Sequence, residues 1–215
     1  MSETTLYLIR HGETDYNRQR IVQGRRINCE LNQTGRAQAR ALARRLSTVP
    51  IDAIFSSTLR RAEETAAFIA AEHQHLEVFR LEDLEEMSWG VYEGEPPSER
   101  VSRAFESMQL DWARGDYGKR VEGGESILDV QERGLRALEH ILARHEGQTV
   151  AVVTHGRFLR VLLATILDEY GLERMNEIHH ANTCVNHLVH ASGTFKAHLL
   201  NCTAHLDEVE IIEME

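Results

Sequence analysis

The chain has 215 residues, of which 42% are hydrophobic and 27% charged, an ordinary composition for a soluble globular protein. Its formal net charge of −10 argues against nucleic acid or an anionic membrane surface as a partner, because the overall field repels both. No apolar run approaches the ~20 residues that span a bilayer. Residues 1–10 lack a signal peptide's basic leader and long apolar core, so we expect a cytoplasmic location.

The cysteines and histidines show no pattern of a metal site. Cys29, Cys184 and Cys202 are odd in number, widely scattered and form no CxxC pair, which favours neither a disulfide framework nor a zinc site. No HExxH motif is present among the twelve histidines. We therefore expect no metal ion and no cofactor.

Short continuous apolar runs, which are typical of buried strands, alternate along the chain with segments whose apolar residues recur every three or four positions, which is typical of helices. The strongest strand signal is TVAVV at residues 149–153, which runs into the polar turn Thr154-His155-Gly156. Ser126 and Asp129 form an S-x-x-D signature that predicts a helix start. In chain order, the expected elements are a strand at 4–9, a helix through 39–46 capped by Asn32 or Thr34, a strand at 51–55, a helix through 59–69, a strand at 76–81, a helix at 98–114, a helix through 127–142, a strand at 149–153, a helix at 158–167, and strands at 184–190 and 194–200.

This alternation predicts an α/β fold, a three-layer sandwich in which a mostly parallel sheet carries helices on both faces. The length suits a single domain over residues 1–215, with a small helical insertion at about 95–123. In such sheets, ligands gather at the carboxyl ends of the strands. His11 and His155 both follow a predicted strand directly, and this placement separates them from the other histidines.

Four separated segments carry residues suited to phosphoryl transfer: RHGET at 10–14, SSTLRRAEET at 56–65, LEEMSWGVYEG at 84–94 and VVTHG at 152–156. That reaction needs an in-line nucleophile, positive charge around the phosphate oxygens and a proton donor for the leaving oxygen. Neutral imidazole is a competent nucleophile near pH 7, and arginine offers a planar fork that matches phosphate. Two arginines, two histidines and one acid therefore suffice.

These four motifs, in this order, resemble the histidine phosphatase superfamily, in the branch that contains the cofactor-dependent phosphoglycerate mutases. The resemblance implies a phosphoglycerate mutase-like fold and covers nearly the whole chain. It implies that His11 becomes phosphorylated, that Arg10, Arg61 and His155 complete the phosphate pocket, and that Glu86 is the general acid and then the base. Substrate contacts are expected from five further residues, namely Thr14, Asn17, Gln23, Gly24 and Gly156.

The resemblance also selects between neighbouring candidates. The arginine that directly precedes alanine is functional in the family, which favours Arg61 over Arg60. In the family's pattern the functional acid lies four residues before the glycine that corresponds to Gly90. This spacing favours Glu86 over Glu85 or Glu93. The sequence departs from the family at Thr58, where aspartate is common, and in residues 27–31, where Asp-x-Pro-Leu is common. These departures concern the rim of the site and therefore substrate choice.

The resulting hypothesis is a metal-independent phosphatase that hydrolyses small phosphorylated metabolites through a phosphohistidine at His11. One alternative is a mutase of the phosphoglycerate type, and another is a catalytically silent binding module. The short insertion and the RHGETDYN opening favour the phosphatase. A homodimer is common among proteins of this kind, and the sequence leaves the oligomeric state open.

Two segments of the sequence can each be interpreted in two ways. The segment Gly123–Ser126 matches a family signature, although we interpret it mainly as helix capping. Phe105, Met108 and Trp112 form an apolar stripe that indicates core packing, with a contribution to the leaving-group pocket as the alternative.

Overall fold

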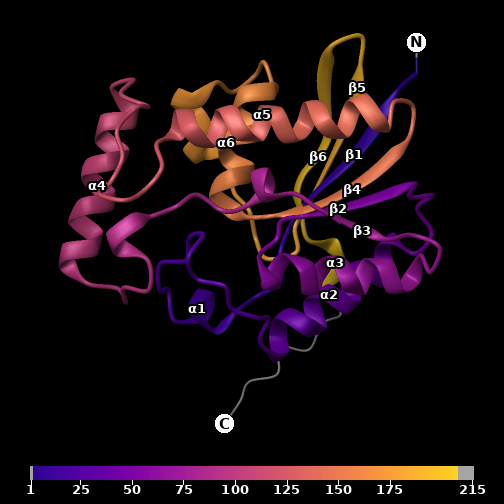
Figure 1. Ribbon diagram of the computed structural model, residues 1–215, viewed down its shortest axis with the longest axis horizontal. Helices are drawn as coiled ribbons and strands as arrows, with labels where there is room; N and C mark the ends of the chain where they lie inside the picture. The colour runs from indigo at the N-terminus through magenta and orange to yellow at the C-terminus, as the bar shows by residue number, and fades with distance from the viewer. Residues whose placement is uncertain (1, 208–215) are drawn as a thin grey trace.

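A six-stranded sheet lies at the centre of the computed structural model, which describes residues 2–207 (Figure 1). The strand order is β3-β2-β4-β1-β5-β6. The strands are β1 (Thr4–Arg10), β2 (Ala53–Ser56), β3 (Val78–Arg80), β4 (Thr149–Thr154), β5 (Val185–Ala191) and β6 (Thr194–Cys202). All six predicted strands are present, with bounds that differ from the prediction by at most two residues.

The sheet is mostly parallel, as predicted. β1 pairs in parallel with β4, β4 with β2, and β2 with β3, whereas β5 runs antiparallel to β1 and β6 antiparallel to β5. The antiparallel pair was not predicted. Ser192 and Gly193 join β5 to β6 with φ angles of 55° and 80°, the left-handed conformations of a two-residue hairpin turn.

Helices cover both faces of the sheet, which confirms the three-layer prediction. In Figure 1, α5 and α6 lie on one side of the strands and α2 and α3 on the other. The α-helices are α1 (Asp15–Arg18), α2 (Gln33–Leu46), α3 (Arg60–Glu72), α4 (Glu99–Ala113), α5 (Ile127–Arg144) and α6 (Gly156–Ile166). Short 3₁₀ helices occupy Glu82–Leu84, Gly90–Tyr92, Leu172–Glu177 and Ala204–Leu206. The one-turn α1 was not predicted.

β4 shows why the central strands are continuously apolar. Val150 and Val152 belong to the core cluster beneath α5 and α6, while Ala151 and Val153 belong to the cluster beneath α2 and α3. A strand buried on both faces needs apolar side chains at every position. Within residues 2–207, we find no helix of the length and apolarity that crossing a membrane requires.

The helix α4 lies to one side of the sheet, at the end of α5 (Figure 1). Ser98 caps it by accepting a hydrogen bond from the Val101 amide at 3.3 Å. Met108 and Trp112 are buried in the core cluster and Phe105 packs against it, which confirms the core-packing interpretation of this stripe. The division of the chain into one domain with an insertion at about 95–123 stays a prediction.

Candidate active site

The two histidines singled out from the sequence lie side by side because their strands are neighbours. β1 and β4 are paired in register, with Arg10 opposite Thr154, so the residues that follow leave the sheet at the same edge. The ring centroids of His11 and His155 are 5.1 Å apart, and both residues are buried. The parallel pairing therefore assembles the centre of the candidate site.

Hydrogen bonds fix the orientation of the His11 ring. Nδ1 lies 2.7 Å from the carbonyl oxygen of Gly12, so in the neutral ring Nδ1 carries the hydrogen and donates it to this acceptor. Nε2 lies 3.3 Å from Nε of Arg61, which can only donate. The lone pair of His11 therefore resides on Nε2 and points toward a guanidinium group.

Glycine at position 12 is required by close packing. A Cβ on Gly12 would lie 2.6 Å from the carbonyl oxygen of Gly35, in the first turn of α2. The Gly12 amide donates to Oγ1 of Thr65 at 3.0 Å, and the Thr65 hydroxyl in turn donates to the carbonyl of Arg61 at 2.7 Å. The turn after β1 is thus attached to both helices on this face.

Arg61 lies in the site, whereas Arg60 lies on the surface. The buried Arg61 guanidinium donates to the carbonyls of Ile27 at 2.6 Å and Gly24 at 3.3 Å, in addition to its contact with His11. The exposed Arg60 instead contacts the carboxylate of Glu30 at 3.3 Å. This geometry supports the choice of Arg61 that followed from the family resemblance.

Two nitrogen atoms beside His11 are buried without a hydrogen-bond partner among the described residues. One is Nε of Arg10, whose NH1 donates to the carbonyl of His180 at 2.7 Å. The other is Nδ1 of His155, whose Nε2 lies 2.8 Å from the hydroxyl of Ser57. Gly156 makes room for Arg10, since a Cβ there would lie 3.2 Å from Nε. Buried donors without acceptors are costly, which points to a ligand that supplies the acceptors.

Both imidazole rings are held neutral. Burial lowers the pKa of His11 well below 6.5, and the neighbouring Arg61 and Arg10 lower it further. Burial also lowers the pKa of His155 well below 6.5, with added contributions from Arg61 and His11. His11 therefore keeps its lone pair at neutral and mildly acidic pH.

Glu86 faces the same centre from the segment that follows β3. Its carboxylate accepts hydrogen bonds from the amides of Arg157 at 3.1 Å and Phe158 at 3.0 Å, in the first turn of α6. A third amide, that of Met87, donates at 2.9 Å. Glu86 lines a cavity of about 220 Å³ together with Arg10 and Gly156. A carboxyl group thus lies beside Arg10, the last residue of β1, in position to exchange a proton with a ligand.

The other two acids of this segment have structural partners. Glu85 accepts from Nε of Arg25 at 2.5 Å and from the Thr58 hydroxyl. Glu93 accepts from the amide of Arg26 at 2.7 Å and from the amide of Trp89 at 2.9 Å. Neither lines the cavity that contains Glu86. Thr58, at the position where the family commonly has aspartate, thus contacts Glu85.

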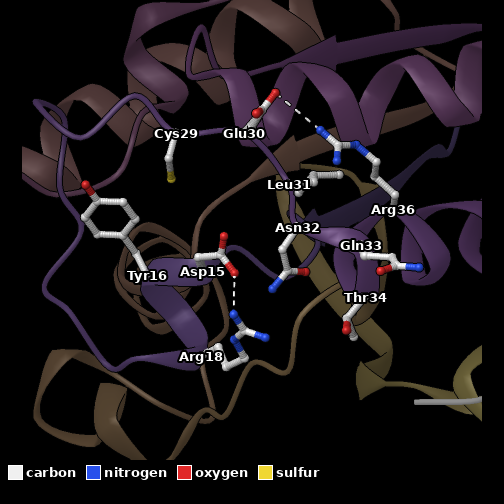
Figure 2. Close-up of a pocket in the computed structure, with 10 residues that line it drawn as sticks. All are labelled: Asp15, Tyr16, Arg18, Cys29, Glu30, Leu31, Asn32, Gln33, Thr34 and Arg36. Carbon is white, nitrogen blue, oxygen red and sulfur yellow. Dashed lines mark hydrogen bonds and ion pairs between the residues drawn. The ribbon is translucent and has the colours of Figure 1, made fainter. Parts of the chain in front are cut away.

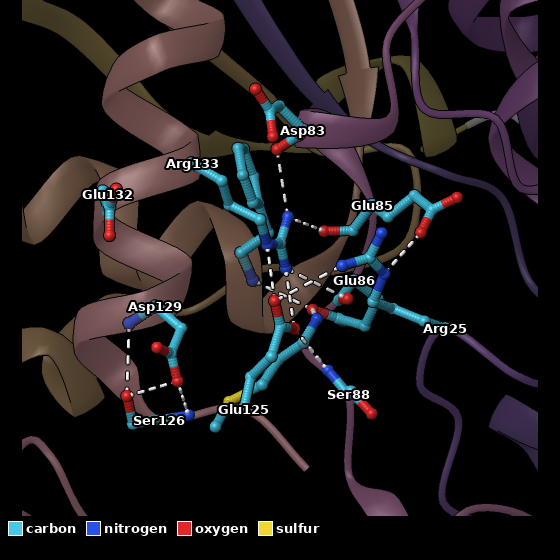
Figure 3. Close-up of polar contacts among 12 residues, drawn as sticks. Arg25, Asp83, Glu85, Glu86, Ser88, Glu125, Ser126, Asp129, Glu132 and Arg133 are labelled. Atoms are coloured by element: carbon cyan, nitrogen blue, oxygen red, sulfur yellow. Dashed lines mark hydrogen bonds and ion pairs between the residues drawn. The ribbon is translucent and has the colours of Figure 1, made fainter. Parts of the chain in front are cut away.

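Arg133 and Glu125 hold residues 83–88, the acid segment that contains Glu86, in place (Figure 3). This supporting role, the brace of the acid segment, was not predicted from the sequence. The guanidinium of Arg133 is buried and donates to the carbonyls of Asp83 at 3.0 Å, Glu85 at 2.6 Å and Glu86 at 3.1 Å. It also pairs with the carboxylate of Glu125 at 2.9 Å. Glu125 further accepts from the amide of Ser88 at 2.7 Å.

The signature Gly123–Ser126 therefore has two functions. Ser126 caps α5 in a capping box with Asp129, as predicted, and the preceding Glu125 holds the acid segment. In the sequence, Arg133 looks like any charged residue on the solvent-facing side of an amphipathic helix. Only its burial in the folded protein reveals that it supports the acid segment.

Four of the five residues predicted to contact substrate form the rim near α1. Oδ1 of Asn17 accepts hydrogen bonds from the amide of Thr14 at 3.2 Å and from the hydroxyl of Thr14 at 3.1 Å. Nδ2 of Asn17 donates to none of the described residues. The Thr14 hydroxyl also contacts Oε1 of Gln23 at 3.0 Å. Gly24 lies against Glu93, whose Oε1 would be 2.4 Å from a Cβ at this position. The fifth residue, Gly156, lines the cavity itself.

A separate hollow of about 320 Å³ lies between α1 and the start of α2 (Figure 2). Its wall includes Tyr16, Cys29 and Asn32, with the ion pairs Arg18–Asp15 and Arg36–Glu30 at its rim. None of the candidate catalytic residues lines it. Over residues 2–207, no three or more His, Cys, Asp or Glu side chains cluster as metal ligands would.

Comparison with known proteins identifies the family. The family model described as histidine phosphatase superfamily (branch 1) matches residues 6–203. A relative from Arabidopsis thaliana named metal-independent phosphoserine phosphatase is 36% identical over 165 residues, covering 76% of this chain and 68% of the relative.

Among solved structures, YhfR of Bacillus stearothermophilus superposes with a TM-score of 0.82 at 33% identity, covering 95% of this chain and all of that chain. The phosphoserine phosphatase of Entamoeba histolytica, as a mutant in complex with phosphoserine, gives a TM-score of 0.80 at 27% identity, covering 94% of this chain and 99% of that chain.

Proposed function

From the premise that this chain belongs to branch 1 of the histidine phosphatase superfamily and is a phosphomonoester hydrolase, we propose that it works through a phosphohistidine at His11. The observation that carries the proposal is the fixed orientation of His11. Its Nδ1 is held by the carbonyl of Gly12, and its Nε2 lone pair faces the buried guanidinium of Arg61. Nucleophile and phosphate-binding charge are thus placed together.

In the first step, Nε2 of His11 attacks phosphorus. A bond forms between nitrogen and phosphorus, and the bond from phosphorus to the ester oxygen breaks, with its electron pair leaving on that oxygen. Arg61 exchanges its contact with Nε2 for a phosphate oxygen, while Arg10 and His155 contribute the ring and guanidinium nitrogens that have no partner among the described residues. The carboxyl group of Glu86 gives its proton to the departing alcohol oxygen.

In the second step, a water oxygen attacks phosphorus and Glu86, now a carboxylate, accepts the proton that the water loses. The nitrogen–phosphorus bond breaks, its electron pair returns to Nε2 of His11, and inorganic phosphate leaves. Atoms and charges balance without a metal ion or cofactor. Asn17 offers an additional amide donor to the phosphate from the rim.

The substrate we propose is a small phosphorylated metabolite. The cavity beside Glu86 has a volume of about 220 Å³, which excludes a macromolecular leaving group from this space. Phosphoserine, the ligand named for the Entamoeba histolytica relative, is a suitable first substrate to test.

A phosphate-release assay with a chelator present tests the nucleophile. We expect His11→Ala to lower kcat/KM by at least ~10⁴-fold, because removal of a nucleophile eliminates the covalent route. His75→Ala is the matched control, since His75 is exposed beyond the end of α3. Undiminished turnover by His11→Ala would refute the mechanism. Conversion of 3- to 2-phosphoglycerate without phosphate release would instead establish a mutase.

The dependence on leaving group tests Glu86. p-Nitrophenolate leaves without a proton, whereas an alkoxide does not, so Glu86→Gln should slow the first step far more for an alkyl phosphate. With p-nitrophenyl phosphate we expect a burst of one nitrophenolate per site, followed by slow turnover, because the second step still needs the base. Equal losses on both substrates without a burst would contradict the assignment.

A further inference from the structure

Two arginines line the leaving-group side of the site and have no part in the phosphate chemistry. Arg157 and Arg160 lie three residues apart on α6, so they share one face of the helix. Both line the same cavity as Glu86 and Arg10. The phosphate already has two arginines, Arg10 and Arg61, and the second pair calls for another explanation.

Neither arginine of this pair forms an ion pair within residues 2–207, although the nearby carboxylate of Glu86 acts to raise the pKa of both. Every ion pair in that range involves other arginines or lysines, and neither Arg157 nor Arg160 takes part in one. Glu86 is the acid that lines the cavity, and its carboxylate is engaged by backbone amides rather than by a guanidinium. The cavity therefore holds an excess of positive charge beside the catalytic acid.

Arg157 is held in place by neutral partners. Its NH1 donates to Oδ1 of Asn176 at 2.8 Å, and its guanidinium carbon lies 5.7 Å from the ring centroid of Trp89 and 5.2 Å from that of Trp112. Burial and the charge of Arg160 lower the pKa of Arg157 to about 10, so it stays charged at pH 7. A guanidinium fixed by aromatic rings without a counterion is preorganised for an anion.

His180 adds a neutral donor to the same wall. It lines the cavity, and its Nε2 is buried without a hydrogen-bond partner among the described residues. Burial, Arg160 and Arg10 lower the pKa of His180 to about 3, so the ring is neutral at pH 7. Nδ1 of His180 lies 3.7 Å from Sγ of Cys184, and burial raises the pKa of this thiol to about 11. When the protonated thiol donates to Nδ1, Nε2 carries the ring hydrogen and can donate one hydrogen bond to an acceptor in the cavity.

The direction of the proposed reaction places the alcohol part of the substrate here. Glu86 protonates the leaving oxygen, so the atoms beyond that oxygen extend into the cavity that Glu86 lines. We propose that Arg157, Arg160 and His180 form a subsite for a second anionic group, so that the preferred substrates are small phosphomonoesters whose alcohol carries a carboxylate or a second phosphate. This inference rests on the proposed function, because it uses the placement of Glu86 at the leaving oxygen.

The arrangement of the cavity restricts the class further. Glu86, Arg157 and Arg160 line one cavity of about 220 Å³, so we expect the second anionic group within a few bonds of the ester oxygen. A carboxylate and a second phosphate share the planar or tripodal array of oxygens that a guanidinium recognises. Substrate pairs that differ in one group can separate these two sources.

Steady-state kinetics of the full-length protein on matched substrates tests the subsite. 3-Phosphoglycerate and glycerol 3-phosphate share a three-carbon skeleton and differ in the carboxylate. 1,3-Propanediol bisphosphate and 3-hydroxypropyl phosphate differ in the second phosphate. We expect the anionic member of at least one pair to have a kcat/KM ~10- to 100-fold higher, the range of charge-assisted hydrogen bonds. The pair with the larger ratio identifies the anion.

Arg160→Met is the critical variant, because the Arg160 side chain makes no hydrogen bond or ion pair with the described residues and its loss leaves no partner unsatisfied. We expect the preference for the anionic member to fall toward one. Arg160→Lys should retain part of it, since the charge remains but the fork is lost. Arg44→Met on α2 removes an equal charge from an exposed position and controls for the overall field.

Two results distinguish the possible failures. If both members of each pair release phosphate equally and Arg160→Met leaves the ratios unchanged, the subsite is refuted while the proposed hydrolysis stands. If the folded protein releases phosphate from no substrate, the proposed function fails and the subsite fails with it. A preference that persists in Arg160→Met but disappears in Arg157→Met and in His180→Ala would overturn the role of Arg160.

Discussion

Replacement of Arg133 by methionine should damage both stability and catalysis. Methionine keeps most of the side-chain volume and removes the guanidinium. The variant leaves the carboxylate of Glu125 without its buried partner, and it leaves the backbone carbonyls of Asp83, Glu85 and Glu86 without their donors. These carbonyls belong to the segment that contains Glu86, the proposed catalytic acid, so one residue supports both properties.

The expected magnitude follows from the burial of the pair. The side chains of Arg133 and Glu125 are 4% and 16% exposed, and removing one partner of a buried ion pair costs about 3–5 kcal/mol. A displacement of the acid by ~1 Å can lower kcat by ~10²-fold. Because Arg133 does not line the cavity, KM should change less than kcat.

Arg136→Met is the matched control, one turn further along α5. Arg136 pairs with Asp83 at 3.0 Å and with Glu132, but its side chain is 52% exposed, so its loss should change the stability little. Urea unfolding gives the free energies, and hydrolysis of p-nitrophenyl phosphate gives kcat. Addition of Glu125→Gln to Arg133→Met should cost less than the sum of the single changes, since it removes a carboxylate whose remaining ion pair, with the partly exposed Arg25, is longer at 3.5 Å. Equal unfolding midpoints and equal kcat for Arg133→Met and Arg136→Met would show that the brace does not exist.

Three further outcomes are expected. Gly12→Ala should lose about 1–3 kcal/mol of stability and most of its activity, because its Cβ would meet the carbonyl of α2 at 2.6 Å; a fully active variant with wild-type Tm would contradict the packing. Ser126→Ala should lose about 1 kcal/mol in urea unfolding by removing the cap of α5, with kcat little changed. Burial lowers the pKa of His180 to about 3 and that of His205 to about 4. As the pH falls below 6.5, the unfolded chain therefore binds protons at these histidines before the folded chain does. Stability present above pH 6.5 should therefore decline as the pH falls toward 4, and a Tm constant from pH 7 to 4.5 would refute this.

The periodic parts of the chain predicted the fold well. The run TVAVV is apolar at every position because β4 is buried on both faces, and the stripes of α2, α3 and α5 follow from helices that bury one side. The antiparallel pairing of β5 and β6 was missed because it depends on a two-residue turn at Ser192 and Gly193. A turn of two residues leaves only a short signal in the sequence.

The catalytic candidates were found in the sequence because several of them follow strands or belong to short contiguous motifs. The supporting role of Arg133 and Glu125 was missed because it depends on burial against a distant segment; Arg133 contacts carbonyls 47 and 48 residues earlier in the chain. The pair Arg157 and Arg160 was missed for a related reason. On an isolated helix they are ordinary solvated charges. Only the tertiary structure packs Trp89 and Trp112 against Arg157 and brings both arginines to the cavity that Glu86 lines.

By itself, the sequence determined the family resemblance, the layered α/β fold and the identity of His11 as a nucleophile candidate, since these follow from local period and contiguous motifs. Only the tertiary structure decided which nitrogen of His11 carries the lone pair, which of three neighbouring glutamates lines the cavity, and where positive charge remains without a counterion. The physical reason is that hydrogen bonding, burial and charge pairing are set by residues far apart in the chain, which come together only when the strands align.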